Sequence, residues 1–595
     1  MLQNPTEKIY SLRNSFTIIG LTGRTGAGVS DVAKILSSDF SEISYKQPLK
    51  TEELNNKKRK YNISYRFAEV NWKKYKTISY KNVILLHILR CDRKIFFQFL
   101  EEKRFKQNGI EKLEKLYSIF FDLIQQIQSI PSIDGNLKKK KDLTKLSTIF
   151  FSKDFENFSD NFNSILREDD FIKRIELFSI IANNIRKNGN CHGITEENGI
   201  HIFSLAETIN RIIKGYKKND CHIVIDSLRN SLEIMFFKER YSAFYMVSIN
   251  SAYRRKFLRK KYEGSDFITK LLDIDEKEYL GKGVSEGEFY LQDVQNCIQK
   301  SDIHLNNNPP FEDSLKVLDD EQIFKRSEYY LVGQIIKYTG LILHPGLVTP
   351  SAQERCMQMA YVAKSNSGCI SRQVGAVITD QDFSLKSTGW NDVPKNVTPC
   401  LLKNIHNLKN EEDIEAYSPY EKEDKYEFNS QFKSYYAEVN PENTQGLNCA
   451  YCFKDFQNLL EKKENQVHTR SLHAEENAML QISKYGGQPL KNGILFTTAS
   501  PCELCAKKAR QLEIKQIYYI DPYPGISKWH ILRDGKEIPQ LILFSGAVGK
   551  AYHKLFEPVM SYKDELAMII NKRPKNDLKK ALSGDSEKIL DTVTM

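Results

Sequence analysis

The sequence predicts an α/β protein with two separate α/β domains. In both halves, short apolar runs typical of buried strands alternate with amphipathic stretches typical of helices. Each half also carries its own chemical motif directly after such a run. The 595 residues exceed the usual size of one domain. With 41% hydrophobic and 27% charged residues, the composition is that of a globular protein and excludes a fibrous or disordered one.

The first predicted strand, residues 16–21, leads into a glycine-rich turn and then a helix. The turn has the spacing of a P-loop, whose backbone N–H groups cradle phosphates at a helix N-terminus. Its residues are Gly23, Arg24, Thr25, Gly26, Ala27, Gly28, Val29 and Ser30. Val29 stands where the motif requires Lys, and this change weakens phosphoryl transfer but leaves the cradle. We therefore predict that this turn binds a nucleotide without acting as a kinase.

Two further strands, at residues 222–226 and 244–249, extend the same parallel sheet, so the first domain is expected to be P-loop kinase-like. Asp226 ends the first of these strands, where it is placed to share a Mg²⁺ ion with Ser30. A basic segment follows the second strand and is suited to clamping a polyphosphate. It contains Arg254, Arg255, Arg259, Lys260 and Lys261.

The domain boundaries follow from changes in composition. We place the first domain at residues 1–310, with a helical insertion from 50 to 220 that is rich in Lys, Phe and Asn. The pattern breaks at the Asn- and Pro-rich residues 306–310, which we take as a linker. The second domain is expected at 325–572 with a polar insertion from 400 to 470, and residues 573–595 form a polar tail.

The strongest motif lies in the second domain, where His473 and Glu475 open a predicted helix and a strand at 494–498 leads to Cys502 and Cys505. One His and two Cys give Zn²⁺ three protein ligands and leave a fourth position for water, as in catalytic zinc sites. Zinc lowers the pKa of a bound water to about 7. Glu475 is placed to pass that proton to a ring nitrogen and then to a departing amine, which carbonyls near Ser500 would orient. The motif order is the signature of zinc-dependent nucleobase deaminases.

The residues before this motif resemble the first two strands of deoxycytidylate deaminases, with SRQVGAVI at 371–378 and STGWN at 387–391. The resemblance implies a three-layer α/β/α fold of the cytidine deaminase type. It also implies that Asn391 and Arg372 contact the sugar or phosphate of a nucleotide. A second, structural zinc follows from the same resemblance, held by Cys369, Cys400, Cys449 and Cys452.

Both halves together resemble the bacterial antiphage dCTP deaminases, in which a P-loop kinase-like domain is fused to a deoxycytidylate deaminase-like zinc domain. Further matching segments lie at 225–230, 236–241 and 521–525. The resemblance implies conversion of dCTP to dUTP, with dCMP to dUMP as a second activity, so that deoxycytidine nucleotides are depleted during phage infection. It also implies a regulatory role for the first domain, control by a small RNA, and assembly into a homo-oligomer.

Charge and cysteine content narrow the function classes further. The 87 Lys+Arg and 76 Asp+Glu give a net charge of +11, which over this length suits small polyanions better than DNA. Eleven sparse cysteines exclude a disulfide scaffold, and the chain has no signal pattern or apolar run of membrane length, so we expect a cytosolic protein without membrane contact. Two alternatives stay open: a polynucleotide (RNA or single-stranded DNA) cytidine deaminase, and a nucleotide kinase or regulatory nucleotide-binding protein.

Overall fold

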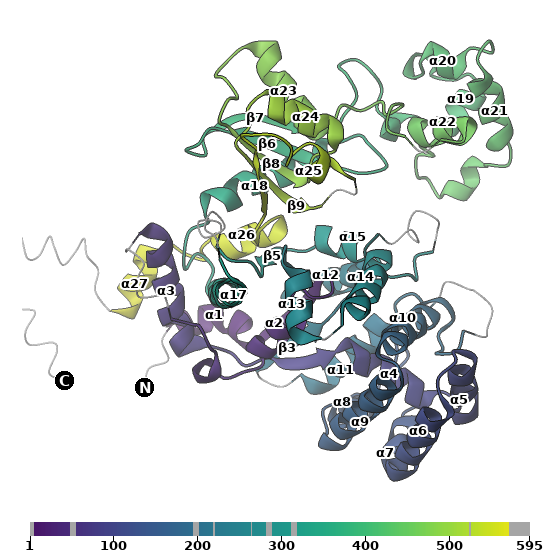
Figure 1. Ribbon diagram of the computed structural model, residues 1–595, viewed down its shortest axis with the longest axis vertical. Helices are drawn as coiled ribbons and strands as arrows, with labels where there is room; N and C mark the ends of the chain where they lie inside the picture. The colour runs from purple at the N-terminus through teal and green to yellow at the C-terminus, as the bar shows by residue number, and fades with distance from the viewer. Residues whose placement is uncertain are drawn as a thin grey trace, which may run out of the picture. The chain divides into compact units, whose positions relative to one another are not determined.

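The chain forms two compact units (Figure 1), seen in a computed structural model that describes residues 5–47, 55–193, 201–217, 220–262, 264–280, 288–310, 318–463, 465–522 and 525–570. Unit 1 contains residues 1–349 and 550–595, and unit 2 contains residues 350–549. The units therefore divide at residue 349, later than the boundary expected between 310 and 325, and residues 550–570 belong to unit 1. The expected polar tail, 573–595, lies outside the described residues.

Unit 1 is built on a parallel sheet. Its strands run in the order β5-β4-β1-β3-β2. Their bounds are β1 (Phe16–Gly23), β2 (Lys76–Ser79), β3 (Cys221–Asp226), β4 (Phe244–Asn250) and β5 (Ile303–Asn306). Because all five are parallel, their carboxyl ends meet at one edge, which is where open α/β sheets bind ligands. Gly23, Ser79 and Asp226 thus come together, and Ser79 pairs directly with Asp226.

The segment taken as a linker is part of this sheet edge. Asn306 and Asn307 are buried, and the Asn306 backbone exchanges two 2.9 Å hydrogen bonds with the side chain of Gln334. Gln334 lies on α17 (Asp320–Leu343), which packs on β5 and on α3 (Asn56–Asn71). The Asn-rich composition therefore reflects side chains that satisfy buried backbone groups at a strand end, and α17 extends unit 1 beyond residue 310.

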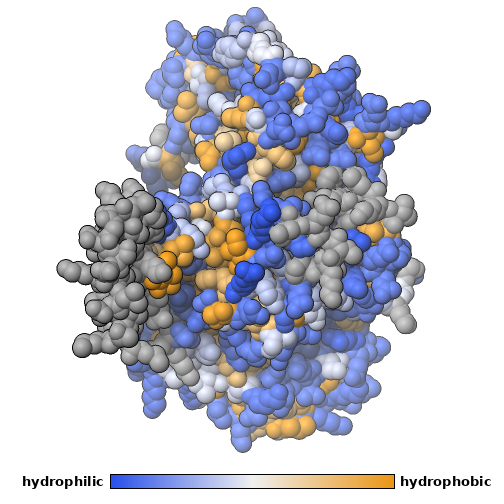
Figure 2. All heavy atoms as spheres, turned by 90° about the vertical axis from the view of Figure 1, so that its left-hand side faces the viewer, coloured by the Kyte–Doolittle hydropathy of each residue, from blue (hydrophilic) through white to orange (hydrophobic). Residues whose placement is uncertain are grey.

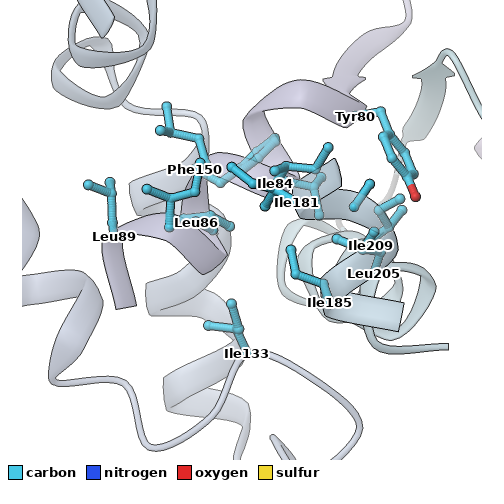
Figure 3. Close-up of a cluster of buried hydrophobic side chains, with 14 of the residues drawn as sticks. Tyr80, Ile84, Leu86, Leu89, Ile133, Phe150, Ile181, Ile185, Leu205 and Ile209 are labelled. Atoms are coloured by element: carbon cyan, nitrogen blue, oxygen red, sulfur yellow. The ribbon is translucent and has the colours of Figure 1, made fainter. Parts of the chain in front are cut away.

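Most of the expected insertion between β1 and β3 is helical, although β2 within it joins the sheet. Side chains from several of its helices meet in one hydrophobic core, which includes Ile84, Phe150, Ile181 and Leu205 (Figure 3). The helices after α3 are α4 (Tyr80–Arg90), α5 (Arg93–Glu102), α6 (Gln107–Ile119), α7 (Phe121–Gln128), α8 (Lys140–Phe150), α9 (Lys153–Asp169), α10 (Phe171–Asn188) and α11 (Ser204–Tyr216).

The remaining helices of unit 1 surround the sheet. They are α1 (Pro5–Ser15), α2 (Val29–Leu36), α12 (Ser231–Arg240), α13 (Arg254–Lys261), α14 (Ser265–Leu280), α15 (Val294–Gln299), α26 (Lys550–Phe556) and α27 (Tyr562–Ile569). Helix α26 packs on α17, and α27 packs on α1. The last two helices thus belong to unit 1 because their contacts are made there.

Unit 2 has a mixed sheet covered by helices on both faces, as the sequence predicted. Its strand order is β10-β9-β8-β6-β7, and β6 is antiparallel to both its neighbours. Helix α18 (Ala352–Ala363) shares a core with one face, and α23 (Ala474–Tyr485) and α24 (Glu503–Gln511) share a core with the other. The strands are β6 (Gly375–Thr379), β7 (Leu385–Trp390), β8 (Ile494–Ala499), β9 (Gln516–Asp521) and β10 (Gln540–Leu543); α25 (Ser527–His530) and β11 (Gly546–Ala547) follow.

The expected insertion of unit 2 forms a small helical cluster with its own aromatic core (Figure 1). At its centre Lys403 and Glu421 form a fully buried ion pair of 2.7 Å, and Tyr451 donates to the same carboxylate at 2.6 Å. The helices are α19 (Ile405–Lys409), α20 (Pro419–Lys422), α21 (Glu427–Tyr435) and α22 (Phe453–Glu461).

The face of the molecule seen in Figure 2 is mostly hydrophilic, with hydrophobic side chains in small scattered groups. Such scattered groups are normal on protein surfaces. Among the described helices, none combines the length and the apolar character needed to cross a bilayer.

We expect Arg186→Met to destabilise unit 1 by about 3–5 kcal/mol, because it leaves the fully buried Glu233 without its counter-charge. Arg186, on α10, donates to Glu233 on α12 at 3.0 Å, to Tyr80 Oη at 2.9 Å and to the Tyr290 carbonyl at 2.6 Å. The midpoint of urea unfolding measures the effect. Lys153→Met, which removes an exposed ion pair with Glu156, is the control and should cost less than about 1 kcal/mol. Equal shifts for both variants would contradict the prediction.

Candidate active site

The three predicted metal ligands of unit 2 lie together. His473 is the N-cap of α23, Cys502 is the N-cap of α24, and Cys505 lies in the first turn of α24. His473 Nδ1 is 3.2 Å from Cys502 Sγ and 3.4 Å from Cys505 Sγ. Their ligand atoms all lie within 4.8 Å of one another, and in the described ranges no other group of three such residues is as compact.

The donor set fits zinc. Tetrahedral coordination with Zn–S of about 2.3 Å and Zn–N of about 2.0–2.1 Å needs ligand atoms at roughly the separations seen here. Hydrogen bonding from the Cys505 thiol, and then from His473, lowers the pKa of Cys502 to about 4. A thiolate is the form of cysteine that ligates a metal. Three protein ligands leave one position for water, as in catalytic sites.

Glu475 lies in the first turn of α23 beside these ligands. Its side chain is buried, and burial raises the pKa of its carboxyl group. Thr497 on β8 donates to Glu475 Oε1 at 3.2 Å. A buried carboxyl group with a raised pKa, held in one orientation, is suited to accepting and returning a proton.

Close packing of α23 on β7 fixes the start of this helix. A Cβ atom on Gly389 would lie 2.4 Å from the Ala474 carbonyl oxygen and 2.4 Å from the Ala478 nitrogen, so only glycine allows the strand to approach this closely. Ser387 donates to the Ala478 carbonyl at 2.8 Å, and Asn477 donates to the Trp390 carbonyl at 3.0 Å. These contacts determine where the N-terminus of α23 lies.

The structure places the predicted substrate contacts near the ends of the strands in unit 2. Asn391 follows β7, and its side chain accepts from the Val374 N–H and donates to the Arg372 carbonyl, both at 2.7 Å. Arg372 pairs with the buried Asp521 at 2.7 Å, and the Ser500 N–H donates to the Asp521 carbonyl at 2.8 Å. Contact of these residues with a nucleotide stays a prediction.

The four cysteines predicted to hold a second zinc are all described. Cys400 is buried and the other three are half-buried. Burial raises the pKa of Cys452 to about 12 and also raises that of Cys400. Because the described part of the chain groups only His473, Cys502 and Cys505 within 4.8 Å, the second zinc stays a prediction.

In unit 1 the glycine-rich turn joins β1 to α2, and Gly28 adopts a left-handed backbone with φ of 102°. The turn is held by Asp275 of α14, which accepts from the Thr25 N–H at 2.6 Å and from Arg24 Nε at 2.9 Å. Arg254 also donates to Asp275, at 2.8 Å, and to the Thr25 carbonyl. Arg254 was expected to clamp a polyphosphate, but here it fixes the turn, because the 1% exposed Asp275 needs compensating charge.

The turn borders a cavity of about 880 Å³, large enough for a nucleotide. Ser30 also lines an adjoining cavity of about 300 Å³ together with Asp226. The oxygen ligands that Mg²⁺ prefers are thus present in one place. Of the predicted basic segment, Lys260 and Lys261 line the larger cavity.

Sequence reasoning missed Thr497, Asp521 and Asp275 as positioning residues. Thr497 alternates with inward-facing residues of an apolar strand, which gives no signal of its own. Asp521 lies in a segment that sequence comparison singled out without a role, and its neighbours 523–524 lie outside the described residues. Asp275 is 250 residues from Thr25 along the chain, so only the folded structure brings them together.

Residues 350–521 match the family model described as the cytidine and deoxycytidylate deaminase zinc-binding region. The chain is 26% identical over 183 residues to a deoxycytidylate deaminase of Schizosaccharomyces pombe, a match that covers 31% of this chain and 41% of that protein. It is also 26% identical over 172 residues to the deoxycytidylate deaminase of Enterobacteria phage T4, covering 28% of this chain and 76% of that protein. Unit 2 therefore contains a deoxycytidylate deaminase-like zinc-binding domain.

A solved structure is also similar to this chain: the dCMP deaminase of cyanophage S-TIM5 in complex with dCMP and dUMP. It is 19% identical, covers 33% of this chain and 99% of its own, and has a TM-score of 0.21. The assignment of the domain rests on the sequence matches and on the geometry of the His473, Cys502 and Cys505 group.

Cys505→Ala should purify with almost no zinc, because two remaining protein ligands hold this ion poorly. Elemental analysis of the purified protein measures the zinc content per chain. The control is Cys356→Ala, which changes another buried thiol of unit 2 and should keep the wild-type content. Wild-type protein with one zinc per chain would contradict the second, four-cysteine site, and Cys505→Ala with unchanged zinc would contradict the first.

Proposed function

We propose that unit 2 catalyses the hydrolytic deamination of deoxycytidine nucleotides, dCTP to dUTP and dCMP to dUMP. The observation that carries this proposal is the buried Glu475 carboxyl group beside the His473, Cys502 and Cys505 triad. Deaminases named for dCMP are among the relatives of this domain. We extend the proposal to dCTP because the fusion of the two units resembles the antiphage dCTP deaminases.

The residues divide the chemistry between them. His473, Cys502 and Cys505 would hold zinc, which when bound lowers the pKa of a water ligand to about 7. Glu475 takes a proton from that water, donates it to N3 of the cytosine ring, and then protonates the departing amine as ammonia. Its burial excludes solvent, so the proton stays within the site. Arg372 and Asn391 are assigned to the sugar or phosphate end of the nucleotide, with carbonyls near Ser500 facing the amine.

Glu475→Gln should lose deamination by a factor of about 10²–10⁴ or more, because the amide cannot carry the proton. Release of ammonium from dCTP and dCMP measures the activity. The variant should keep its zinc, since Glu475 is not one of the three ligands. Glu476→Gln is a matched control: Glu476 pairs with Lys508 at the surface of the same helix, so activity should stay near wild type. Substantial turnover by Glu475→Gln would contradict the assigned role.

The substrate class is tested by offering the protein dCTP, dCMP, CTP, single-stranded DNA and RNA. We expect uracil products from the free deoxynucleotides. Deamination only of a polymer would instead support a polynucleotide deaminase, and phosphate transfer from ATP would support a kinase. The basic net charge favours the first alternative, and the glycine-rich turn favours the second.

A second function, nucleotide binding by unit 1, is favoured by one specific observation. The glycine-rich turn lies at the carboxyl edge of a parallel sheet and borders a cavity of about 880 Å³. We propose that this P-loop kinase-like unit binds a nucleotide, with Mg²⁺ held by Ser30 and Asp226, and regulates the deaminase. The wider role that we propose is depletion of dCTP in antiphage defence by a cytosolic homo-oligomer, under the control of a small RNA.

A further inference from the structure

The smaller cavity of unit 1 is lined by an excess of cationic side chains. It adjoins the glycine-rich turn at the carboxyl ends of β2 and β3 and has a volume of about 300 Å³. Its cations come from four different helices: Lys81 of α4, Arg167 of α9, Arg174 of α10 and Lys261 of α13. Asp226 is the one acidic residue that lines this cavity in the described part of the chain.

These cations repel one another. Desolvation, and then the charge of Arg174, lowers the pKa of Lys81, and the carboxylates of Asp160 and Asp226 offset this only in part. Desolvation and the charge of Arg167 likewise lower the pKa of Arg174. A folded protein that brings like charges together in this way gains stability when an anion enters between them.

Hydrogen-bond donors in this cavity also lack acceptors. The buried Nε of Arg174 has no acceptor among the described residues, although its Nη1 donates to Asn163 at 2.9 Å. Within the same described ranges Lys81 forms neither a hydrogen bond nor an ion pair of the kinds that fix Arg24 or Arg254. Buried donors without acceptors are rare in proteins, and at cavities they mark the position of a ligand.

The positions of Lys81 and Arg174 are set by well-packed helices. Ile84, one turn after Lys81, and Ile181, two turns after Arg174, both point into the core of the insertion (Figure 3). The buried Arg186 of α10 donates to Tyr80, which precedes Lys81. The two cations are therefore held in place before any ligand binds, which lowers the entropic cost of binding.

We propose that Lys81 and Arg174, with Arg167 and Lys261 at the rim, form a phosphate-binding subsite beside the glycine-rich turn. Rigid guanidinium and ammonium groups around a small cavity are the chemistry that recognises phosphate oxygens. The subsite supplies, from the helical insertion, the positive charge that Val29 does not provide at the end of the P-loop. This inference rests on the proposed binding of a nucleotide by unit 1.

The phosphate has two sources, the terminal phosphate of the nucleotide itself or a separate phosphate ligand. Calorimetric titration of the full-length protein with Mg²⁺-ATP, Mg²⁺-ADP and, on ADP-saturated protein, inorganic phosphate distinguishes them. Lys81→Ala should weaken ATP binding by about tenfold or more while changing ADP binding by less than about twofold, if the subsite holds the terminal phosphate. If the phosphate is separate, Lys81→Ala should instead abolish the binding of inorganic phosphate and leave both nucleotides unaffected.

The controls keep the result specific. Lys81→Arg should restore most of the lost affinity because the charge returns, and Arg174→Ala should reproduce the effect of Lys81→Ala. Lys153→Ala removes the same charge from an exposed position on α9 and should bind all three probes as the wild type does. The inference is overturned if Lys81→Ala and Arg174→Ala both bind all three like the wild type. Failure of the wild type to bind ADP would instead overturn nucleotide binding by unit 1.

Discussion

The direct contact between α23 and β7 is the constraint on which the candidate active site depends. Gly389 lets the strand backbone reach the first turn of the helix, and this contact fixes His473 as the N-cap and Glu475 one residue inside the helix. The two cysteines reach the same point from β8, which pairs with β6 on the far side from β7. The triad thus forms because one sheet sets the start of two helices that are about 30 residues apart in sequence.

The sequence predicted the chemistry of this site more completely than its surroundings. His473, Cys502 and Cys505 were identifiable because few residue types bind zinc and their spacing is limited by the helix starts. The supporting residues were not, since Thr497 and Asp521 gain their roles only when β8 and β9 lie side by side. Strands were recognised from apolar runs, whereas the boundary near residue 310 was misplaced, because buried asparagines at a strand end have the composition of a linker.

Both insertions fold around hydrophobic cores of their own and bring charged groups close to a site of their unit. In unit 1, α4 and α10 deliver Lys81 and Arg174 to the sheet edge. In unit 2, Arg470, three residues before His473, pairs with the buried Glu421 of the insertion at 3.0 Å. Ordering an insertion therefore also orders the segment that leads into the triad. A buried ion pair specifies one geometry even where it adds little net stability.

The glycine-rich turn is better suited to binding than to phosphoryl transfer. Val29 removes the cation that follows the transferred phosphate, and Asp275 holds the turn through Arg24 and the Thr25 N–H. Cations from the insertion would compensate charge without moving along a reaction path, because they lie on packed helices. A nucleotide that binds such a unit, without being consumed, shifts any equilibrium in which the bound and free forms differ in energy. Placed on one chain with a deaminase domain, a unit of this kind would make deamination respond to the concentration of a second nucleotide.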